Sequence, residues 1–173
     1  GQKMVDGKDQ RPLVSLVMNF TKPTDTKPSL LTFNEVTTFL HEFGHALHGM
    51  FSKCTYGSTS MDGVSRDFVE LPSQFMENYA LEKEWLDTWA VHYQTGEKIP
   101  QEYIDKIKKS SNFQAGYASD RQLSFGMVDM AWHTITEPVT EPLADFEQRA
   151  MGKTEIMPLV KGSAFSPAFG HIF

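Results

Sequence analysis

The sequence contains little cysteine and no long hydrophobic run, and each shortage excludes a class of protein. Cys54 is the single cysteine among 173 residues, so no disulfide can form within the chain. One unpaired cysteine is compatible with a reducing compartment, and we expect a cytoplasmic location, with the periplasm as the alternative. Because no apolar run is long enough to span a bilayer, we expect no transmembrane helix and no membrane partner.

Basic residues are also in the minority. Sixteen Lys and Arg side chains stand against 22 Asp and Glu, which gives a net charge of −6 and argues against nucleic-acid binding. The composition, 40% hydrophobic and 22% charged, is typical of a globular protein, so we expect residues 1–173 to form a single domain. An initiator methionine is missing too, since the chain opens with Gly1, and we therefore expect a fragment of a longer protein.

The most informative stretch is a predicted helix that contains His41-Glu42-Phe43-Gly44-His45. Thr32 followed by Glu35 forms a capping box, so the helix should begin near Phe33. Its apolar residues recur at helical spacing: Val36, Phe39, Leu40, Phe43 and Leu47. Gly44 costs about 1 kcal/mol relative to alanine inside a helix, so its presence suggests close packing against another element.

The pattern H-E-x-x-H has a specific chemistry on a helix. His41 and His45 lie one turn apart on the same face, where two imidazoles can converge on one zinc ion at roughly 2.0–2.1 Å. Glu42 projects beside them, and its carboxylate can reach a metal-bound water rather than the metal. The stretch therefore predicts a zinc hydrolase with one Zn²⁺ ion and with Glu42 as its general base.

A catalytic zinc ion needs a third protein ligand and an open position for water. The metzincin pattern requires a third histidine at the position of Phe51, so that class is excluded. His48 lies two turns beyond His41, too far for one tetrahedral ion to reach both easily. Cys54 lies in a loop rich in Gly, Ser and Thr, without a partner cysteine.

Carboxylates on the next predicted helix are better candidates. That helix should start near Asp67, because Pro72 is tolerated only in a first turn, and should continue to roughly Tyr93. Reasoning from the residues alone leaves three candidates for the third ligand: Asp67, Glu70 and Glu77.

Two stretches together carry a resemblance to a known family. Residues 41–48 (HEFGHALH) and residues 67–74 (DFVELPSQ) are similar to the thimet oligopeptidase family of zinc peptidases, and within it most similar to the bacterial peptidyl-dipeptidases, called dipeptidyl carboxypeptidases. Shorter similarities recur in residues 112–117, 129–133 and 169–173, so the resemblance extends along most of the chain. One departure is Ser60-Met61-Asp62, where the family carries Ser-Gly-Thr.

The resemblance assigns roles that the residues alone left open. It implies that Glu70 is the third zinc ligand, that Glu77 supports the site without binding the metal, and that His171 contacts substrate. Family members are several-fold longer, and their substrate-binding tyrosines lie beyond the position of Phe173. The resemblance therefore implies that the remainder of the parent peptidase is a missing partner of this chain.

The expected activity is hydrolysis of oligopeptides, with release of a dipeptide from the free C-terminus. An endo-acting oligopeptidase of the same family is one alternative, and a zinc-binding fragment without turnover is another. The expected fold is mainly α, a zincin-like helical catalytic core with one or a few short N-terminal β-strands. Leu13 to Phe20, a β-branched-rich apolar run, is the predicted strand. Further helices are predicted after Pro100, over residues 114–135 and around residues 145–151.

Overall fold

The computed structural model of the protein describes residues 3–5, 8–157 and 160–172. The chain is mainly helical, as expected, and it divides into two compact units, residues 1–108 and 109–173. Each unit is described by itself, and the single-domain organisation stays a prediction. None of the helices in these described residues is long and apolar enough to cross a membrane.

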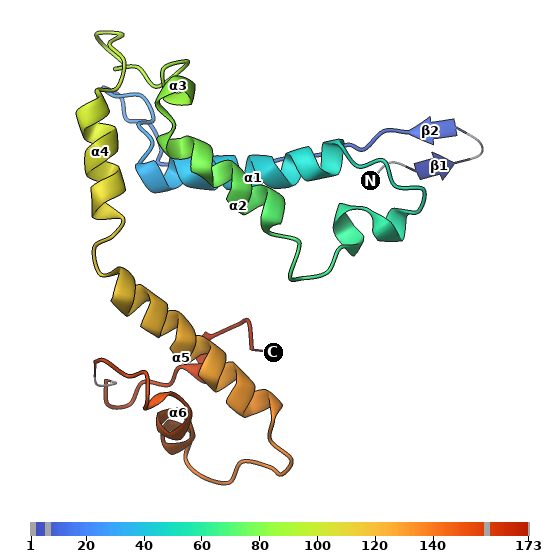
Figure 1. Ribbon diagram of the computed structural model, residues 1–173, viewed down its shortest axis with the longest axis vertical. Coiled ribbons are helices and arrows are strands. Elements are labelled where there is room, and N and C mark those ends of the chain that lie inside the picture. Colours follow the sequence, from blue (N-terminus) through green and yellow to red (C-terminus); the bar gives the residue numbers. More distant parts are fainter. Residues whose placement is uncertain (1–2, 6–7, 158–159, 173) are drawn as a thin grey trace. The chain divides into compact units, whose positions relative to one another are not determined.

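The first unit contains most of the helices and the only sheet of the described residues (Figure 1). Its elements are β1 (Lys3–Val5), β2 (Lys8–Gln10), α1 (Phe33–Met50), η1 (Gly57–Thr59), η2 (Met61–Gly63), α2 (Leu71–Glu77), η3 (Asn78–Leu81), α3 (Lys83–Leu86) and α4 (Gln101–Ser110). Helix α4 extends two residues beyond Lys108, the last residue of this unit. The two strands pair antiparallel, with Lys3 opposite Gln10.

Helix α1 begins with the predicted capping box. The Thr32 hydroxyl accepts a hydrogen bond from the Glu35 amide at 3.3 Å, and the Glu35 carboxylate accepts one from the Thr32 amide at 2.7 Å. Thr21 adds two more bonds, because its amide and hydroxyl donate to Glu35 Oε1 at 2.5 and 2.8 Å. The hydrogen bonds from Thr32 and Thr21 lower the pKa of Glu35 to about 2. The same carboxylate thus caps α1 and ties the preceding segment to it.

Helices α1 and α2 pack against each other at Gly44, which confirms the close approach predicted for that glycine. A Cβ atom on Gly44 would lie 2.5 Å from the carbonyl oxygen of Pro72 and 2.6 Å from Cα of Ser73. No side chain larger than hydrogen fits between the two backbones. The contact brings the start of α2 close to the α1 turn that carries the histidines (Figure 1).

The second predicted helix is shorter than expected at both ends. It begins at Leu71 rather than near Asp67, with Pro72 in its first turn as predicted, and it ends at Glu77 rather than near Tyr93. The Asn78 side chain provides a reason for the early end, because its amide donates to the Phe75 carbonyl at 2.9 Å and competes with the helical pattern.

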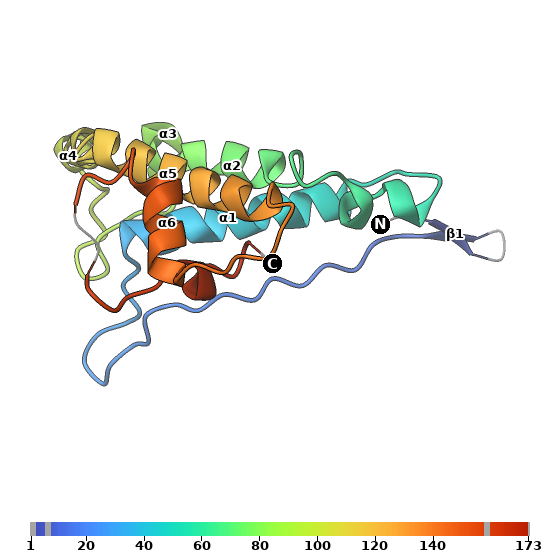
Figure 2. The same ribbon diagram turned by 90° about the horizontal axis from the view of Figure 1, so that it is seen from below.

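The strand predicted over Leu13–Phe20 is wrong. These residues carry no regular secondary structure (Figure 2). Most of their side chains are exposed. A strand needs a neighbour that completes its ladder of hydrogen bonds, and within the described residues the β-structure is limited to β1, β2 and an isolated bridge between Val91 and Lys98. Val14 instead lies against α1, where a Cβ on Gly49 would be 3.2 Å from its Cγ2.

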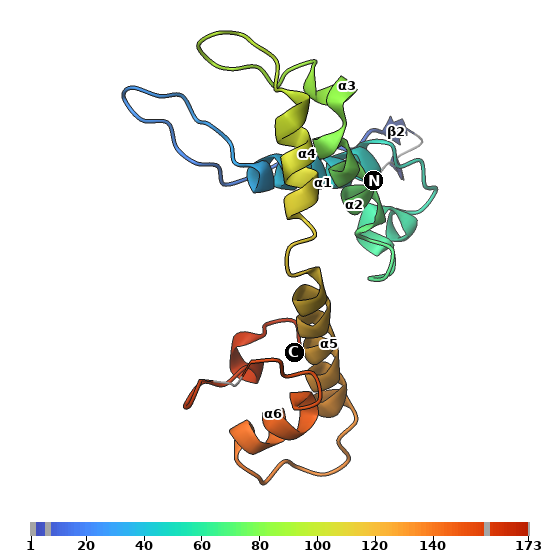
Figure 3. The same ribbon diagram turned by 60° about the vertical axis from the view of Figure 1, so that its left-hand side comes forward.

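The second unit consists of α5 (Ala115–His133), α6 (Leu143–Met151) and η4 (Ser166–Ala168), so both helices predicted there are present (Figure 3). Its core contains apolar side chains from both helices and from the C-terminal segment: Val128, Trp132, Ala150, Met151, Phe165, Phe169 and Ile172. Phe125 stacks on Phe165 with ring centroids 4.8 Å apart.

A buried carboxylate ties the C-terminal segment of this unit to its helices. Glu147 is only 1% exposed, and it accepts hydrogen bonds from the amides of Phe165 at 2.9 Å and Ser166 at 2.6 Å. From α5, the Trp132 indole donates to the Ser166 hydroxyl at 2.9 Å. Nothing in the sequence marks Glu147, because its role depends on contacts that only the folded chain creates.

Candidate metal centre

Three side chains converge where α1 and α2 meet. Nε2 of His41 lies 3.2 Å from Oε2 of Glu70, and Nε2 of His45 lies 3.1 Å from the same oxygen. One potential ligand atom from each residue falls within 4.8 Å of the other two. The two imidazole rings are nearly perpendicular, with centroids 5.0 Å apart. The three side chains thus form a cluster of possible metal ligands, and each of them is partly exposed to solvent.

The local fold explains why these three residues meet. His41 and His45 are one helical turn apart, so they share a face of α1. Glu70 is the N-cap residue immediately before α2, and the contact at Gly44 brings the first turn of α2 against α1. Neither helix alone would supply more than two of the ligands.

The cluster fits a zinc ion. In a tetrahedral site with bonds of roughly 2.0–2.1 Å, neighbouring ligand atoms are about 3.3 Å apart. The two separations between the histidine nitrogens and Glu70 Oε2, 3.1 and 3.2 Å, are close to that value. Two imidazoles and one carboxylate also form the donor set of many catalytic zinc sites, which keep a fourth position open.

Ser73 holds the Glu70 carboxylate in place. Its hydroxyl donates to Oε2 of Glu70 at 2.7 Å. This hydrogen bond, together with the nearby imidazoles of His45 and His41, lowers the pKa of Glu70 below its ordinary value. The carboxylate therefore stays ionised, as a metal ligand must. Sequence reasoning missed Ser73, although a serine three residues after the candidate ligand was an available signal.

Glu77 makes a different contact from Glu70. Its Oε1 lies 2.6 Å from Nδ1 of His41, on the opposite side of the ring from Nε2. A carboxylate at Nδ1 favours the tautomer with the proton there, which leaves the Nε2 lone pair available for a metal. Of the three carboxylates that residue reasoning left open, Glu70 is the one grouped with both histidines, whereas Asp67 and Glu77 are outside the three-atom cluster.

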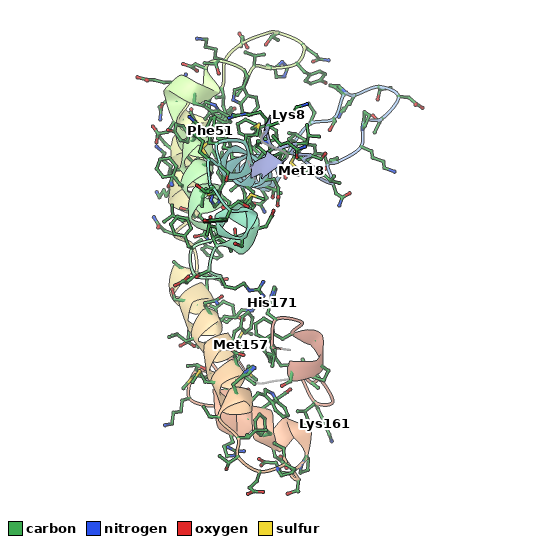
Figure 4. The ribbon with its side chains drawn as sticks, turned by 90° about the vertical axis from the view of Figure 1, so that its right-hand side faces the viewer. Lys8, Met18, Phe51, Met157, Lys161 and His171 are labelled. Carbon is green, nitrogen blue, oxygen red and sulfur yellow. The ribbon has the colours of Figure 1, made fainter. Side chains whose placement is uncertain are left out.

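The other predicted site residues are not brought into this cluster. Glu42 is half-buried on α1, and its carboxylate makes no hydrogen bond within the described part of the chain, so its role as a base stays a prediction. His48 packs edge-on against Phe68, and its Nδ1 is buried without a partner among the described atoms. His171 belongs to the second unit (Figure 4). Its ring lies edge-on to that of Phe169, with centroids 5.6 Å apart, and its contact with substrate also stays a prediction.

An H-E-x-x-H helix, joined by a glutamate from the next helix, defines a candidate site of the zinc metallopeptidase class. The comparison with known families agrees with this class. The profile of Peptidase family M3 matches residues 1–173, and the chain belongs to this family. The resemblance seen in the sequence is thereby confirmed.

Individual relatives from this family are much longer than this chain. It is 40% identical over 177 residues to "Oligopeptidase A" of Escherichia coli, a match that covers 99% of this chain and 25% of the relative. It is 38% identical to "Dipeptidyl carboxypeptidase" of Salmonella typhimurium, over 95% of this chain and 25% of the relative. It is 43% identical to the organellar oligopeptidase A of Arabidopsis thaliana, a match that covers 94% of this chain and 21% of the relative. The chain thus spans about a quarter of the length of these relatives.

Proposed function

We propose that this chain carries the zinc-binding core of a peptidase that hydrolyses oligopeptides. The observation that carries the proposal is the convergence of His41 Nε2, His45 Nε2 and Glu70 Oε2 within 4.8 Å. Membership of Peptidase family M3 supports a peptidase, and the names of the relatives support oligopeptides as the substrate class.

The residues of the chain divide the work of hydrolysis among them. Zinc, when bound, lowers the pKa of water toward neutrality and polarises the scissile carbonyl. His41, His45 and Glu70 hold the ion, and Glu77 orients the His41 ring through Nδ1. The Glu42 carboxylate accepts a proton from the attacking water and afterwards donates it to the leaving amine.

Dipeptide release from the free C-terminus is the finer form of the proposal. A relative named dipeptidyl carboxypeptidase supports it, whereas relatives named oligopeptidase A support an endo-acting enzyme as the alternative. We place His171 at the substrate and assign the rest of the substrate contacts to the remainder of the parent peptidase. A cytoplasmic location, or a periplasmic one, is compatible with the single Cys54.

Metal analysis combined with mass spectrometry of a digested peptide tests the proposal. One zinc per chain with stepwise loss of C-terminal dipeptides supports dipeptide release. One zinc with internal cuts supports the endo-acting alternative, and zinc without any product supports a fragment that binds metal but does not turn over. A chain that binds no zinc contradicts the proposal.

Two variants separate the base from the ligand. Glu42→Gln should keep the zinc and lose the cleavage, because the amide cannot accept the proton. Glu70→Ala should lose both, because it removes one of the three ligands. If cleavage survives in Glu42→Gln, the assigned base is wrong. If zinc affinity survives in Glu70→Ala, another residue completes the site.

A further inference from the structure

A cavity of about 190 Å³ opens in the second unit, between α5, α6 and the segment that follows α6. Two hydrogen bonds hold that segment in place. The hydroxyls of Ser124 and Thr154 lie 2.7 Å apart, and the Gln148 amide donates to Oε2 of Glu155 at 2.7 Å. All four residues line the cavity, so its walls are fixed by the protein itself. None of the metal-cluster residues belongs to this unit.

Much of the cavity wall is apolar. Side chains from both helices and from the segments after α6 form this part of it: Phe125, Met151, Ile156, Met157 and Phe165. Ile156 is 62% exposed and Met157 66% (Figure 4), so a ligand in the cavity would remove apolar surface from water. The volume is below the roughly 300–1,000 Å³ of pockets for drug-sized ligands, and it suits a molecule the size of one amino acid.

Arg121 presents a guanidinium at this cavity. Its Cζ lies 4.3 Å from the centroid of the Phe125 ring, and Phe125 stacks in turn on Phe165. An arginine held over an aromatic ring keeps its N–H donors available for an acceptor. Arg121 forms no ion pair within the described part of the chain. A carboxylate on a ligand would therefore find a positioned partner with two parallel donors.

Acidic side chains line the same cavity and restrict the ligand further. They are Asp120, which is half-buried and forms no ion pair among the described residues, and Glu155, which already accepts from Gln148. A ligand with only a negative charge would be repelled by these carboxylates, and a ligand with only a positive charge would be repelled by Arg121. A zwitterion finds a partner for each of its charges.

We propose that this cavity binds a free amino acid with a large aliphatic side chain, such as leucine. The ligand carboxylate pairs with Arg121, its ammonium group pairs with Asp120, and its side chain packs on the apolar wall. The terminal residue of a peptide carries only one of the two charges, so the site favours the free amino acid over an oligopeptide. The proposal goes beyond the peptidase activity and does not depend on it.

Titration of the unmodified chain with leucine and two blocked forms of it tests the role of the charges. Leucinamide lacks the carboxylate and N-acetyl-leucine lacks the ammonium group, so each should bind about tenfold or more weakly than leucine. Calorimetry measures the three affinities. Equal affinities would overturn the proposal, and so would leucine that does not bind at millimolar concentration.

Variants of the two charged residues identify the site. Arg121→Gln should weaken leucine binding about tenfold or more, and Asp120→Asn should weaken leucine binding but leave the affinity for N-acetyl-leucine unchanged. Lys153→Gln and Glu137→Gln are the matched controls, because both side chains are exposed in the same unit and neither lines the cavity. The controls should stay within about twofold of the unmodified chain. Equal losses in a variant and its control would overturn the proposal.

Methionine methyl groups report where the amino acid binds. With ¹³C-labelled methionine, leucine should shift the NMR signals of Met151 and Met157, which line the cavity. The signals of Met61 and Met76, in the first unit, should stay in place. Leucine that binds without shifting Met151 and Met157 occupies another part of the protein, and that result contradicts the proposal. None of these measurements needs turnover, so they stand whether or not the chain cleaves peptides.

Discussion

At the scale of single residues, the Glu77 carboxylate accepts a hydrogen bond from Nδ1–H of His41, so it should tune the metal site without touching the metal. We predict that Glu77→Gln weakens zinc binding about 10- to 100-fold, because the neutral amide holds the imidazole less firmly and makes it less basic. Competition with a chelator of known affinity measures the change.

A matched substitution shows whether position rather than charge matters at Glu77. Glu82→Gln removes the same charge from an exposed side chain of the same unit that makes no contact with the cluster. It should leave zinc affinity within about twofold, as expected for a screened surface charge. Equal losses in the two variants would show that general electrostatics, rather than the His41 contact, sets the affinity.

At the scale of elements, the crossing of α1 and α2 depends on Gly44. We predict that Gly44→Ala destabilises the protein by roughly 1–3 kcal/mol, because its Cβ would lie 2.5 Å from the Pro72 carbonyl and force the helices apart. Zinc affinity should fall with stability, since the same movement takes Glu70 away from the histidines. Urea unfolding and zinc titration measure the two effects.

Gly126→Ala provides the control for helix propensity. Gly126 lies inside α5, and a Cβ there would meet nothing within 4 Å. The substitution should therefore stabilise the helix by up to about 1 kcal/mol. A Gly44→Ala variant that behaved like Gly126→Ala would contradict the close approach of α1 and α2.

The start of α1 should respond to acid through Glu35. Its folded pKa of about 2 is below the ordinary value of 4.5, so its contribution to stability is fully present above pH 4.5 and is lost as the pH falls toward 2. We predict that the difference in unfolding free energy between the unmodified chain and Glu35→Gln is constant above pH 5 and shrinks between pH 4.5 and 2. A pH series of chemical unfolding curves measures it, and a difference that does not change with pH would contradict the hydrogen bonds from Thr32 and Thr21.

At the scale of the whole molecule, the two units should respond separately to mutation. Glu147→Ala would leave the Phe165 and Ser166 amides without their acceptor, at a cost of roughly 2–5 kcal/mol to the second unit. Zinc affinity should stay unchanged, because all three cluster residues lie in the first unit. Glu137→Ala, at an exposed position of the second unit, is the control. It should change neither the stability of the second unit nor the zinc affinity. A loss of zinc binding in Glu147→Ala would show that the units are coupled.

Local signals in the sequence predicted the elements that local interactions build. The capping box at Thr32 and Glu35 placed the start of α1 correctly, and helical spacing put His41 and His45 on one face. Leu13–Phe20 has strand-like composition, but a strand also requires a partner, which composition does not encode. The early end of α2 at Asn78 reflects competition between a side chain and the helix.

The sequence predicted the part of the candidate site that lies on one helix, but not the part that depends on how two helices pack. The motif predicted the two histidines, but the grouping of Glu70, rather than Asp67 or Glu77, with them depends on the packing of α2 on α1. From the sequence, only the family resemblance implied Glu70. The contacts of Ser73 with Glu70 and of Glu77 with His41 depend on where α2 lies, and spacing alone could not reveal them.

X-ray absorption of the bound zinc is the sharpest test of the metal site, because it reports which atoms bind the ion. We predict one zinc per chain with two imidazole nitrogens at roughly 2.0–2.1 Å and a carboxylate oxygen among the atoms bound to the metal. The imidazole signal should be reduced in His45→Ala, and the carboxylate oxygen should be lost in Glu70→Ala. A bound zinc whose spectrum lacks two imidazoles, or is the same in the unmodified chain and in both variants, would contradict the assignment of His41, His45 and Glu70 as the metal ligands.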